Sequence, residues 1–337
     1  MTLIECVPNF SEGQNTNTLN EIEKAITTNE HVRLLGRESG HSANRSVFTF
    51  VAEPKQIVQA AYQAISVASK LIDMQVHKGE HPRIGACDVC PFIPLDDKPQ
   101  SMEICKDASL RLAKLVGEDL NIPVFLYGES ASQVDRRELA TLRKGGYEGL
   151  AAKVKDKNYL PDFGPEIFNA RSGATIIGAR PILVAYNISL NTNSRQIAKH
   201  IAKQLRAARS SNENELKTVK AMGWVIDDPN YHCAQISMNL MDYKTTGLFE
   251  VFQKVKSEAQ AVGVRVTGSE VVGLVPLAAL LDAAQKTGSA YQDAPIRELV
   301  ARAIDYLGLN VHYSFEPEAK ILDFALNKLG AIELDLK

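Results

Sequence analysis

The densest group of side chains able to do acid–base chemistry lies in residues 73–83, which read Asp-Met-Gln-Val-His-Lys-Gly-Glu-His-Pro-Arg. Gly79 and Pro82 oppose helix formation, so we predict a loop. An imidazole has an ordinary pKa of about 6.5 and can accept or donate a proton near neutral pH. His77 and His81 therefore have three interpretations: exposed loop residues, metal ligands, or an acid–base catalyst.

The metal interpretation gains support from two cysteines that follow the loop. Cys87 and Cys90 form a C-x-x-C motif, so His77, His81 and two thiols lie within fourteen residues, and such a set can hold zinc. The order H-E-x-x-H, which places two histidines on one helical face, is missing. Cys90 also lies in an apolar, strand-like run, where a free cysteine usually packs as a small hydrophobic residue. We therefore prefer packing for both thiols and predict no metal.

Two further segments carry residues of interest. Residues 164–178 are rich in glycine but match neither the phosphate-binding P-loop nor the dinucleotide-binding fingerprint. They form either an inter-domain connection, which we prefer, or a backbone wall against a planar ligand, which glycine permits because it has no side chain. Asn44 and Arg45 form a short polar turn, and the guanidinium of Arg45 could hold a carboxylate through two hydrogen bonds.

The elements that must position these residues alternate between helix and strand. Helical spacing covers residues 19–26, 56–72, 101–120, 135–144, 194–208 and 248–262, and strand-like patterns cover 47–51, 89–93, 123–127 and 235–240. Ser101 is the expected N-cap of its helix. The turn-rich segment 159–180 precedes an apolar run at 181–190, so we expect a domain boundary near residue 180. The alternation predicts an α/β or α+β fold with two units.

Composition excludes several classes of protein. Lys and Arg number 38 and Asp and Glu number 40, for a net charge of −2, so no long-range attraction to nucleic acid or an anionic membrane is expected. The N-terminus shows neither a signal peptide nor a membrane span, and we predict a cytoplasmic location. Five cysteines scattered over 337 residues are typical of reduced thiols rather than a disulfide framework.

Eight blocks follow one another along the chain in the order found in one known family. They are residues 6–13, 44–45, 71–74, 77–83, 161–165, 173–175, 178–180 and 272–277. These blocks resemble the signature blocks of the glutamate formimidoyltransferase family, which includes the N-terminal part of formimidoyltransferase-cyclodeaminase. The similarity runs from about residue 3 to about residue 324.

The resemblance implies a fold and a reaction. The fold would be α/β of the α+β type, with two similar subdomains at residues 1–180 and 181–337. Each would be a mixed β-sheet covered by helices on its outer face, with a folate tunnel between the sheets, and the protein would be a homodimer. The reaction would transfer the formimidoyl group between N-formimidoyl-L-glutamate and tetrahydrofolate, giving L-glutamate and 5-formimidoyltetrahydrofolate, in histidine degradation and one-carbon metabolism. Tetrahydrofolate would be a co-substrate, with no metal.

The resemblance also assigns residues. The family's catalytic histidine falls on His81, which could remove the proton from N5 of the folate and then protonate the departing glutamate nitrogen. The folate segment falls on ten consecutive residues: Gly164, Pro165, Glu166, Ile167, Phe168, Asn169, Ala170, Arg171, Ser172 and Gly173. Candidates for binding the substrates, chiefly their carboxylates, are Glu38, Asn44, Arg45, Lys78, Arg83 and Arg180.

Three alternatives remain at this point. The same fold could transfer a formyl group from 5-formyltetrahydrofolate to glutamate. The protein could bind folate without turnover, in which case His81 would be dispensable. A metal-dependent hydrolase would use His77, His81, Cys87 and Cys90, and it ranks last.

Overall fold

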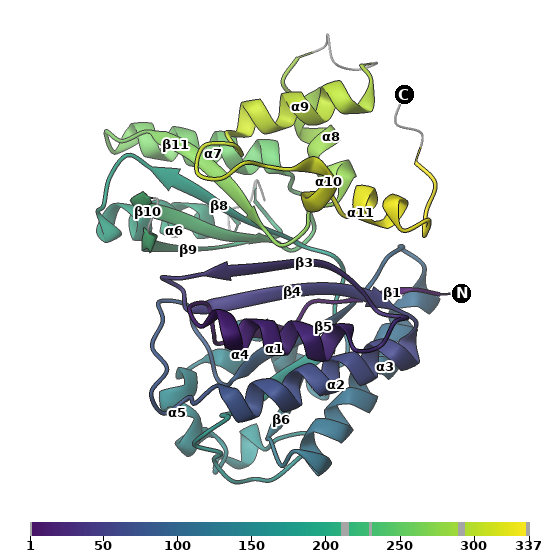
Figure 1. Cartoon of the computed structure of the whole chain (residues 1–337). Coiled ribbons are helices and arrows are strands. Elements are labelled where there is room, and N and C mark those ends of the chain that lie inside the picture. The colour runs from purple at the N-terminus through teal and green to yellow at the C-terminus, as the bar shows by residue number, and fades with distance from the viewer. Residues whose placement is uncertain (1, 210–215, 229–230, 289–293, 335–337) are drawn as a thin grey trace. The chain divides into compact units, whose positions relative to one another are not determined.

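The computed structural model describes residues 2–209, 216–228, 231–288 and 294–334, and the chain divides into two compact units, 1–182 and 183–337 (Figure 1). The strands of the first unit are β1 (Ile4–Cys6), β2 (Asn9–Phe10), β3 (Arg33–Gly40), β4 (Arg45–Ala52), β5 (Cys87–Pro94), β6 (Val124–Gly128) and β7 (Thr175–Ala179). Its helices are α1 (Thr16–Thr27), α2 (Pro54–Leu71), α3 (Pro99–Asp119), α4 (Leu139–Arg143) and α5 (Gly146–Lys153), with 3-10 turns η1 (Val134–Arg137) and η2 (Lys157–Tyr159).

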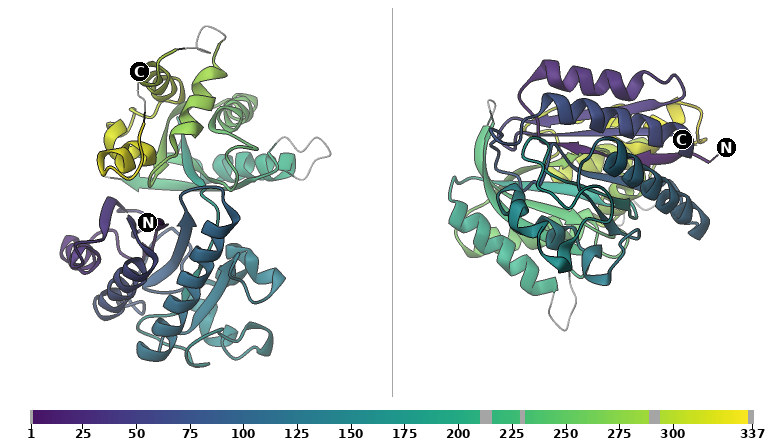
Figure 2. Two further views of the ribbon diagram at one scale, coloured as in Figure 1. Left: turned by 90° about the vertical axis from the view of Figure 1, so that its right-hand side faces the viewer. Right: turned by 90° about the horizontal axis from the view of Figure 1, so that it is seen from below.

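The first unit is built on a mixed sheet. Its strand order is β1-β4-β2-β5-β7-β6, with β3 on β4, and only the pairings of β7 with β5 and β6 are parallel. Side chains alternate along a strand, so Phe48 and Phe50 of β4 point to one face, where they pack with Ile57 of α2 and Leu112 of α3. Helices α1, α2 and α3 cover that face (Figures 1 and 2). The prediction of a mixed sheet covered by helices is confirmed for this unit.

Helix α2 directly precedes the polar loop that carries His77 and His81. Pro54 is the first residue of α2, where a backbone N–H would have no partner within the helix, so proline is well tolerated. The helix ends at Leu71, and Ile72 is its C-cap. The loop that follows runs to β5, so the loop predicted at 73–83 is confirmed. On the opposite face of the sheet, α4 and α5 pack Leu142 and Leu150 against Phe125 and Ile176.

The second unit holds a smaller sheet. Its strands are β8 (Val184–Leu190), β9 (Val219–Asp228), β10 (Tyr231–Leu240) and β11 (Val266–Val272), in the order β11-β8-β10-β9. Its helices are α6 (Arg195–Arg209), α7 (Leu248–Ala261), α8 (Leu277–Gln285), α9 (Ile296–Leu307), α10 (Pro317–Lys320) and α11 (Leu322–Lys328). All three strand pairings are antiparallel, so the mixed sheet predicted for this unit is wrong. Because Asp228 pairs with Tyr231, the connection between β9 and β10 is too short for a parallel crossover.

Two local predictions also differ from the structure. Lys98, not Ser101, is the N-cap of α3, and Ser101 is buried in its first turn, because Pro99 begins the helix earlier. The helix predicted at 135–144 is broken at Glu138, which is extended and separates η1 from α4. Over the described ranges, no helix combines the length and the apolar character needed to cross a bilayer.

Candidate active site

Asn44 joins three segments that are far apart in the sequence. It turns the chain between β3 and β4 with a φ of 44°. Its Oδ1 accepts a hydrogen bond from the amide of Gly13 at 2.9 Å, and its Nδ2 donates to the carbonyl of Lys78 at 2.7 Å. A Cβ on Gly79 would lie 2.3 Å from the carbonyl oxygen of Ala43. The blocks at 6–13, 44–45 and 77–83 therefore pack together, and Asn44 is occupied in holding them.

His77 is part of the same frame. It is 8% exposed, and its Nε2 lies 3.0 Å from the carbonyl oxygen of Asn44. The guanidinium of Arg83 donates from Nε to His77 Nδ1 at 3.2 Å, so Nδ1 must be the acceptor and Nε2 carries the proton. Burial and the charge of Arg83 lower the pKa of His77. Both ring nitrogens of this neutral imidazole are thus engaged in holding the loop.

Arg83 and Lys78 differ in how far they are committed to internal contacts. Arg83 forms a two-pronged ion pair with Glu148 of α5, at 3.0 Å and 2.8 Å, in addition to its bond with His77. Lys78 contributes its carbonyl to the frame, while the residue itself is exposed. Arg83 therefore acts as a brace between the loop and α5, and Lys78 is the more accessible cation.

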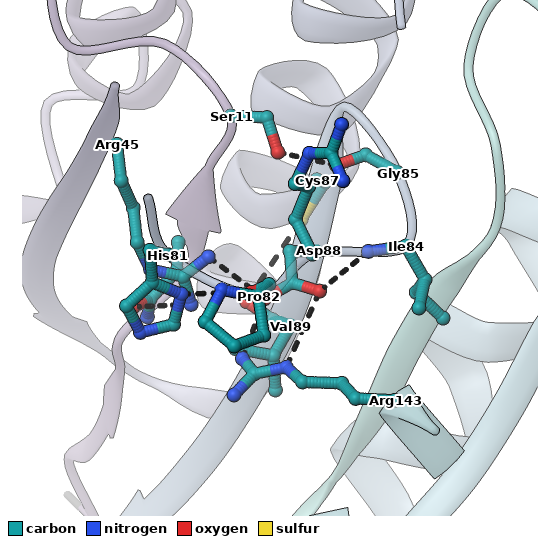
Figure 3. A network of polar contacts seen from close by, with 12 residues as sticks. Ser11, Arg45, His81, Pro82, Ile84, Gly85, Cys87, Asp88, Val89 and Arg143 are labelled. Atoms are coloured by element: carbon teal, nitrogen blue, oxygen red, sulfur yellow. Dashed lines mark hydrogen bonds and ion pairs between the residues drawn. The ribbon is translucent and has the colours of Figure 1, made fainter. Parts of the chain in front are cut away.

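Asp88 is the centre of the polar network in this unit (Figure 3). Its side chain is 0% exposed, and it accepts from Arg45 at 2.7 Å and from Arg143 of α4 at 2.5 Å. It also accepts the backbone amide of Ile84 at 3.0 Å. Burial alone would raise the pKa of Asp88, but Arg143 and Arg45 lower it to about 2. Two guanidiniums against one carboxylate leave a net positive charge at this centre.

His81 lies at the edge of the Asp88 network. Its ring is partly exposed, and Nδ1 lies 2.7 Å from the carbonyl oxygen of Pro82. A carbonyl only accepts, so Nδ1 carries the proton and the basic lone pair is on Nε2. Burial and the charges of Arg45 and Arg143 hold the pKa of His81 well below its ordinary value. His81 is therefore a neutral imidazole at neutral pH, which is the form a general base requires.

Sequence reasoning missed Asp88 and Arg143. A signal for Asp88 was present, because it is an aspartate between Cys87 and Val89 in an apolar run, and a buried carboxylate needs partners. No signal in the sequence pointed to Arg143, because it lies 55 residues after Asp88 and only the tertiary fold brings the two side chains together.

The segment 164–173 borders the loop that carries His81. The carbonyl of Arg171 accepts the amide of Met74, at the start of the loop, at 2.9 Å, and the carbonyl of Ser172 accepts the amide of Ala86, just after the loop, at 2.8 Å. Gly173 forms a β-bridge with Gly85. The segment lies inside the first unit and leads into β7, so the preferred interpretation as an inter-domain connection is wrong.

Replacing Gly173 with alanine should destabilise the protein by two separable effects. Gly173 has a φ of 67°, and a Cβ there would lie 2.1 Å from the carbonyl oxygen of Ile84. The backbone conformation should cost about 1–2 kcal/mol, and the clash about 1–3 kcal/mol more. Gly263 is the matched control, because its φ is 75° and no atom lies within 4 Å of an added Cβ. Urea unfolding should show a larger loss for Gly173→Ala, and equal losses would contradict this account.

The remaining predicted residues lie elsewhere. Arg180 follows β7, where its amide donates to the carbonyl of Phe92 at 3.1 Å. Burial raises the pKa of Tyr127 and of Glu5, and the charge of Arg180 offsets part of that rise. In the part of the chain that the structure describes, no hydrogen bond or ion pair joins Arg180 to Asp88, and the Nη1 of Arg180 donates instead to the carbonyl of Pro181 at 2.9 Å. Glu38 lies on β3, opposite Val47 of β4.

The C-x-x-C cysteines lie in the hydrophobic core. Cys87 is 2% exposed and Cys90 0%, and the Sγ of Cys90 is 3.5 Å from that of Cys6. Burial raises the pKa of both thiols, whereas a metal ligand would be the thiolate. Their position agrees with packing as small hydrophobic residues.

Known proteins are similar to this chain over most of its length. Residues 3–180 match the model of the formiminotransferase domain, N-terminal subdomain, and residues 185–327 match that of the formiminotransferase domain. The chain is 44% identical over 287 residues to a glutamate formimidoyltransferase of Thermoplasma acidophilum, covering 85% of this chain and 92% of that protein. It is 42% identical over 336 residues to the formimidoyltransferase-cyclodeaminase of Mus musculus, covering 97% of this chain but 60% of that protein. The two domain matches together span most of the sequence, and the chain therefore belongs to the formiminotransferase family.

Proposed function

We propose that this protein transfers the formimidoyl group between N-formimidoyl-L-glutamate and tetrahydrofolate, giving L-glutamate and 5-formimidoyltetrahydrofolate, in histidine degradation and one-carbon metabolism. The observation that carries the proposal is the neutral His81 beside Arg45 and Arg143. The printed names of the relatives, including the glutamate formimidoyltransferase of Streptococcus pyogenes serotype M1 at 41% identity, support the same reaction.

His81 would serve first as a base and then as an acid. N5 of tetrahydrofolate forms a bond to the amidine carbon of N-formimidoyl-L-glutamate, and Nε2 of His81 takes the proton that N5 loses. The tetrahedral intermediate then breaks its bond to the glutamate nitrogen, which takes the proton back from His81 and leaves as the amine of L-glutamate. A pKa held below the ordinary value favours both the neutral starting form and the return of the proton.

The positive charge around Asp88 suits the glutamate substrate. Both guanidiniums are tied to Asp88, which fixes their orientation, and their excess charge attracts a carboxylate. Lys78 is an exposed cation in the same loop and would add to that attraction. Asn44 and Arg83 would act indirectly, because their contacts keep the loop in place.

Residues 164–173 would contribute the folate segment. Support comes from the contacts of Arg171, Ser172 and Gly173 with the two ends of the loop that carries His81. Its middle part is open to solvent, and Ile167 is 72% exposed, which is compatible with an apolar contact to a ligand. Binding of substrate by Glu38 and Arg180 rests on the family resemblance.

We also propose a homodimer in the cytoplasm that needs no metal. All five cysteines are free and buried, as is typical of proteins that work in a reducing compartment. The dimer rests on the family resemblance. Within the described ranges, no group of three or more His, Cys, Asp or Glu side chains is arranged to hold a metal ion.

The direct test offers the purified protein two reactions. With N-formimidoyl-L-glutamate and tetrahydrofolate, we expect formation of 5-formimidoyltetrahydrofolate and glutamate, followed by mass spectrometry, and the rate should not change after treatment with a chelator. With 5-formyltetrahydrofolate and glutamate, we expect a much lower rate. A higher rate in this second reaction would instead show that 5-formyltetrahydrofolate is the donor. Folate binding without turnover in either reaction would leave a binding protein.

A further inference from the structure

The first turn of α5 joins two segments that the proposed reaction needs. On one side, the amide of Tyr147 donates to the carbonyl of Arg83 at 2.9 Å, two residues after His81. On the other side, the hydroxyl of Tyr147 donates to the carbonyl of Ala170 at 2.5 Å. Ala170 belongs to residues 164–173, the proposed folate segment. One residue therefore contacts both the loop that carries His81 and the segment that would bind folate.

Tyr147 is held firmly by its surroundings. Its ring packs against the main core of the first unit, and the two-pronged ion pair of Glu148 with Arg83 ties the same turn to the loop. Leu150, three residues further along α5, is 0% exposed and packs in a core cluster with Phe125. Such close packing makes the start of α5 a rigid support.

The middle of the folate segment, by contrast, is held by few contacts. Ile167 is 72% exposed. Between described residues, two hydrogen bonds join residues 165–170 to other segments. The bond from Tyr147 is short, whereas the bond from Asn169 Nδ2 to the carbonyl of Asn121 is long, at 3.4 Å. The position of this part of the segment therefore depends mainly on Tyr147.

The ring and the hydroxyl of Tyr147 contribute in different ways. The ring centroid lies 5.5 Å from that of Phe168, and a phenylalanine would keep this contact. The hydroxyl donates to Ala170, which is partly exposed, so water could replace the donor at little cost in stability. Burial raises the pKa of Tyr147, so the phenol stays protonated and remains a donor. What the hydroxyl adds is a fixed position for the Ala170 carbonyl.

We infer that Tyr147 is a positioning residue for formimidoyl transfer, and that its hydroxyl holds residues 164–173 in the conformation that binds folate. The inference rests on the proposed function, which makes folate a substrate and assigns it to that segment. A segment already held in its binding conformation does not have to be ordered when the ligand binds. If only a fraction of the molecules has that conformation, the apparent Kd rises in inverse proportion to the fraction.

The test compares Tyr147→Phe with the parent, using the full chain in steady-state transfer and in calorimetry. The KM for tetrahydrofolate and the Kd for 5-formyltetrahydrofolate should each rise about three- to tenfold, the effect of losing one hydrogen bond. The KM for N-formimidoyl-L-glutamate should stay unchanged, because the variant keeps the bond from its amide to Arg83. Tyr306→Phe is the matched control. The Tyr306 hydroxyl accepts a hydrogen bond from Gln253 in the second unit, and its loss should change none of these constants.

The pattern of constants distinguishes positioning from a purely structural role. A loss of stability alone would reduce the fraction of active enzyme, and so kcat, with both KM values unchanged, and that result would overturn the inference. An equal rise of both KM values, or unchanged folate constants, would overturn it too. If the parent binds folate but transfers nothing, the proposed function fails, while the Kd of Tyr147→Phe still decides the inference. If the parent binds no folate, both fail. Circular dichroism of each variant establishes folding before these measurements.

Discussion

Replacing His81 with alanine should lower the rate of formimidoyl transfer about 10²- to 10⁴-fold, the usual contribution of a general acid–base group. Nε2 of His81 carries the basic lone pair because Nδ1 donates to Pro82, and alanine supplies no replacement. Folate binding should persist, because residues 171–173 contact the loop through backbone atoms and not through the ring of His81. Rates of the parent and the variant should be compared at saturating concentrations of both substrates.

The pH profile gives a second readout for the same residue. A base works only when neutral, and the pKa of His81 lies well below its ordinary value. The parent should therefore keep its activity as pH falls through about 6.5 and lose it only at more acidic pH, while the residual rate of His81→Ala should lack that step. His41→Ala is the control, because His41 is exposed and takes part in the nearby turn through its backbone carbonyl. A variant at position 81 with the parental rate would remove the proposed role.

The sequence predicted the parts of this site that are encoded locally. The periodicity of residues 56–72 and the breakers Gly79 and Pro82 were sufficient for α2 and the loop. The alternation at 235–240 correctly predicted a strand, β10, with apolar side chains on one face. In each case, residues close in the sequence determine the structure. Apolar side chains recur with the period of a helix or a strand, or a residue such as proline restricts the backbone angles.

The charged networks could not be predicted in the same way, because their members come from distant segments. Asp88, Arg45 and Arg143 are brought together by β5, β4 and α4, and no local pattern relates them. Glu270 and Gln235 lie on strands separated by β8, so their contact depends on strand order. The antiparallel second sheet was also missed, since strand patterns alone do not reveal which strands pair. His81 was singled out by family resemblance, and its chemistry follows from neighbours that only the structure reveals.

Replacing Asp88 with asparagine should cost about 3–5 kcal/mol of stability, the usual effect of breaking a buried ion pair, and should also abolish transfer. Asp88 is the shared acceptor of Arg45 and Arg143, whose side chains are 9% and 15% exposed. An asparagine has no charge, so two nearly buried guanidiniums would repel each other without compensation. The amide of Ile84 would also lose its charged acceptor, and the segment that follows His81 would lose its anchor.

Urea unfolding followed by circular dichroism measures the loss at position 88. Trp224, the single tryptophan, lies in the second unit, so its fluorescence shows whether the change stays in the first unit. Asp107→Asn is the control, because it breaks a surface pair with Arg111 in which Asp107 is 67% exposed, and it should cost less than about 1 kcal/mol.

Acid should remove the difference between Asp88→Asn and the parent. The pKa of Asp88 in the folded protein is about 2, below the value of about 3.9 expected in an unfolded chain. The ion-pair stabilisation is therefore complete above pH 4 and is lost as pH falls from about 4 to 2. Measured stabilities of the parent and the variant should converge over that range. A gap that stays constant there, or a loss at neutral pH no larger than that of Asp107→Asn, would show that the Asp88 carboxylate does not hold the two arginines in solution.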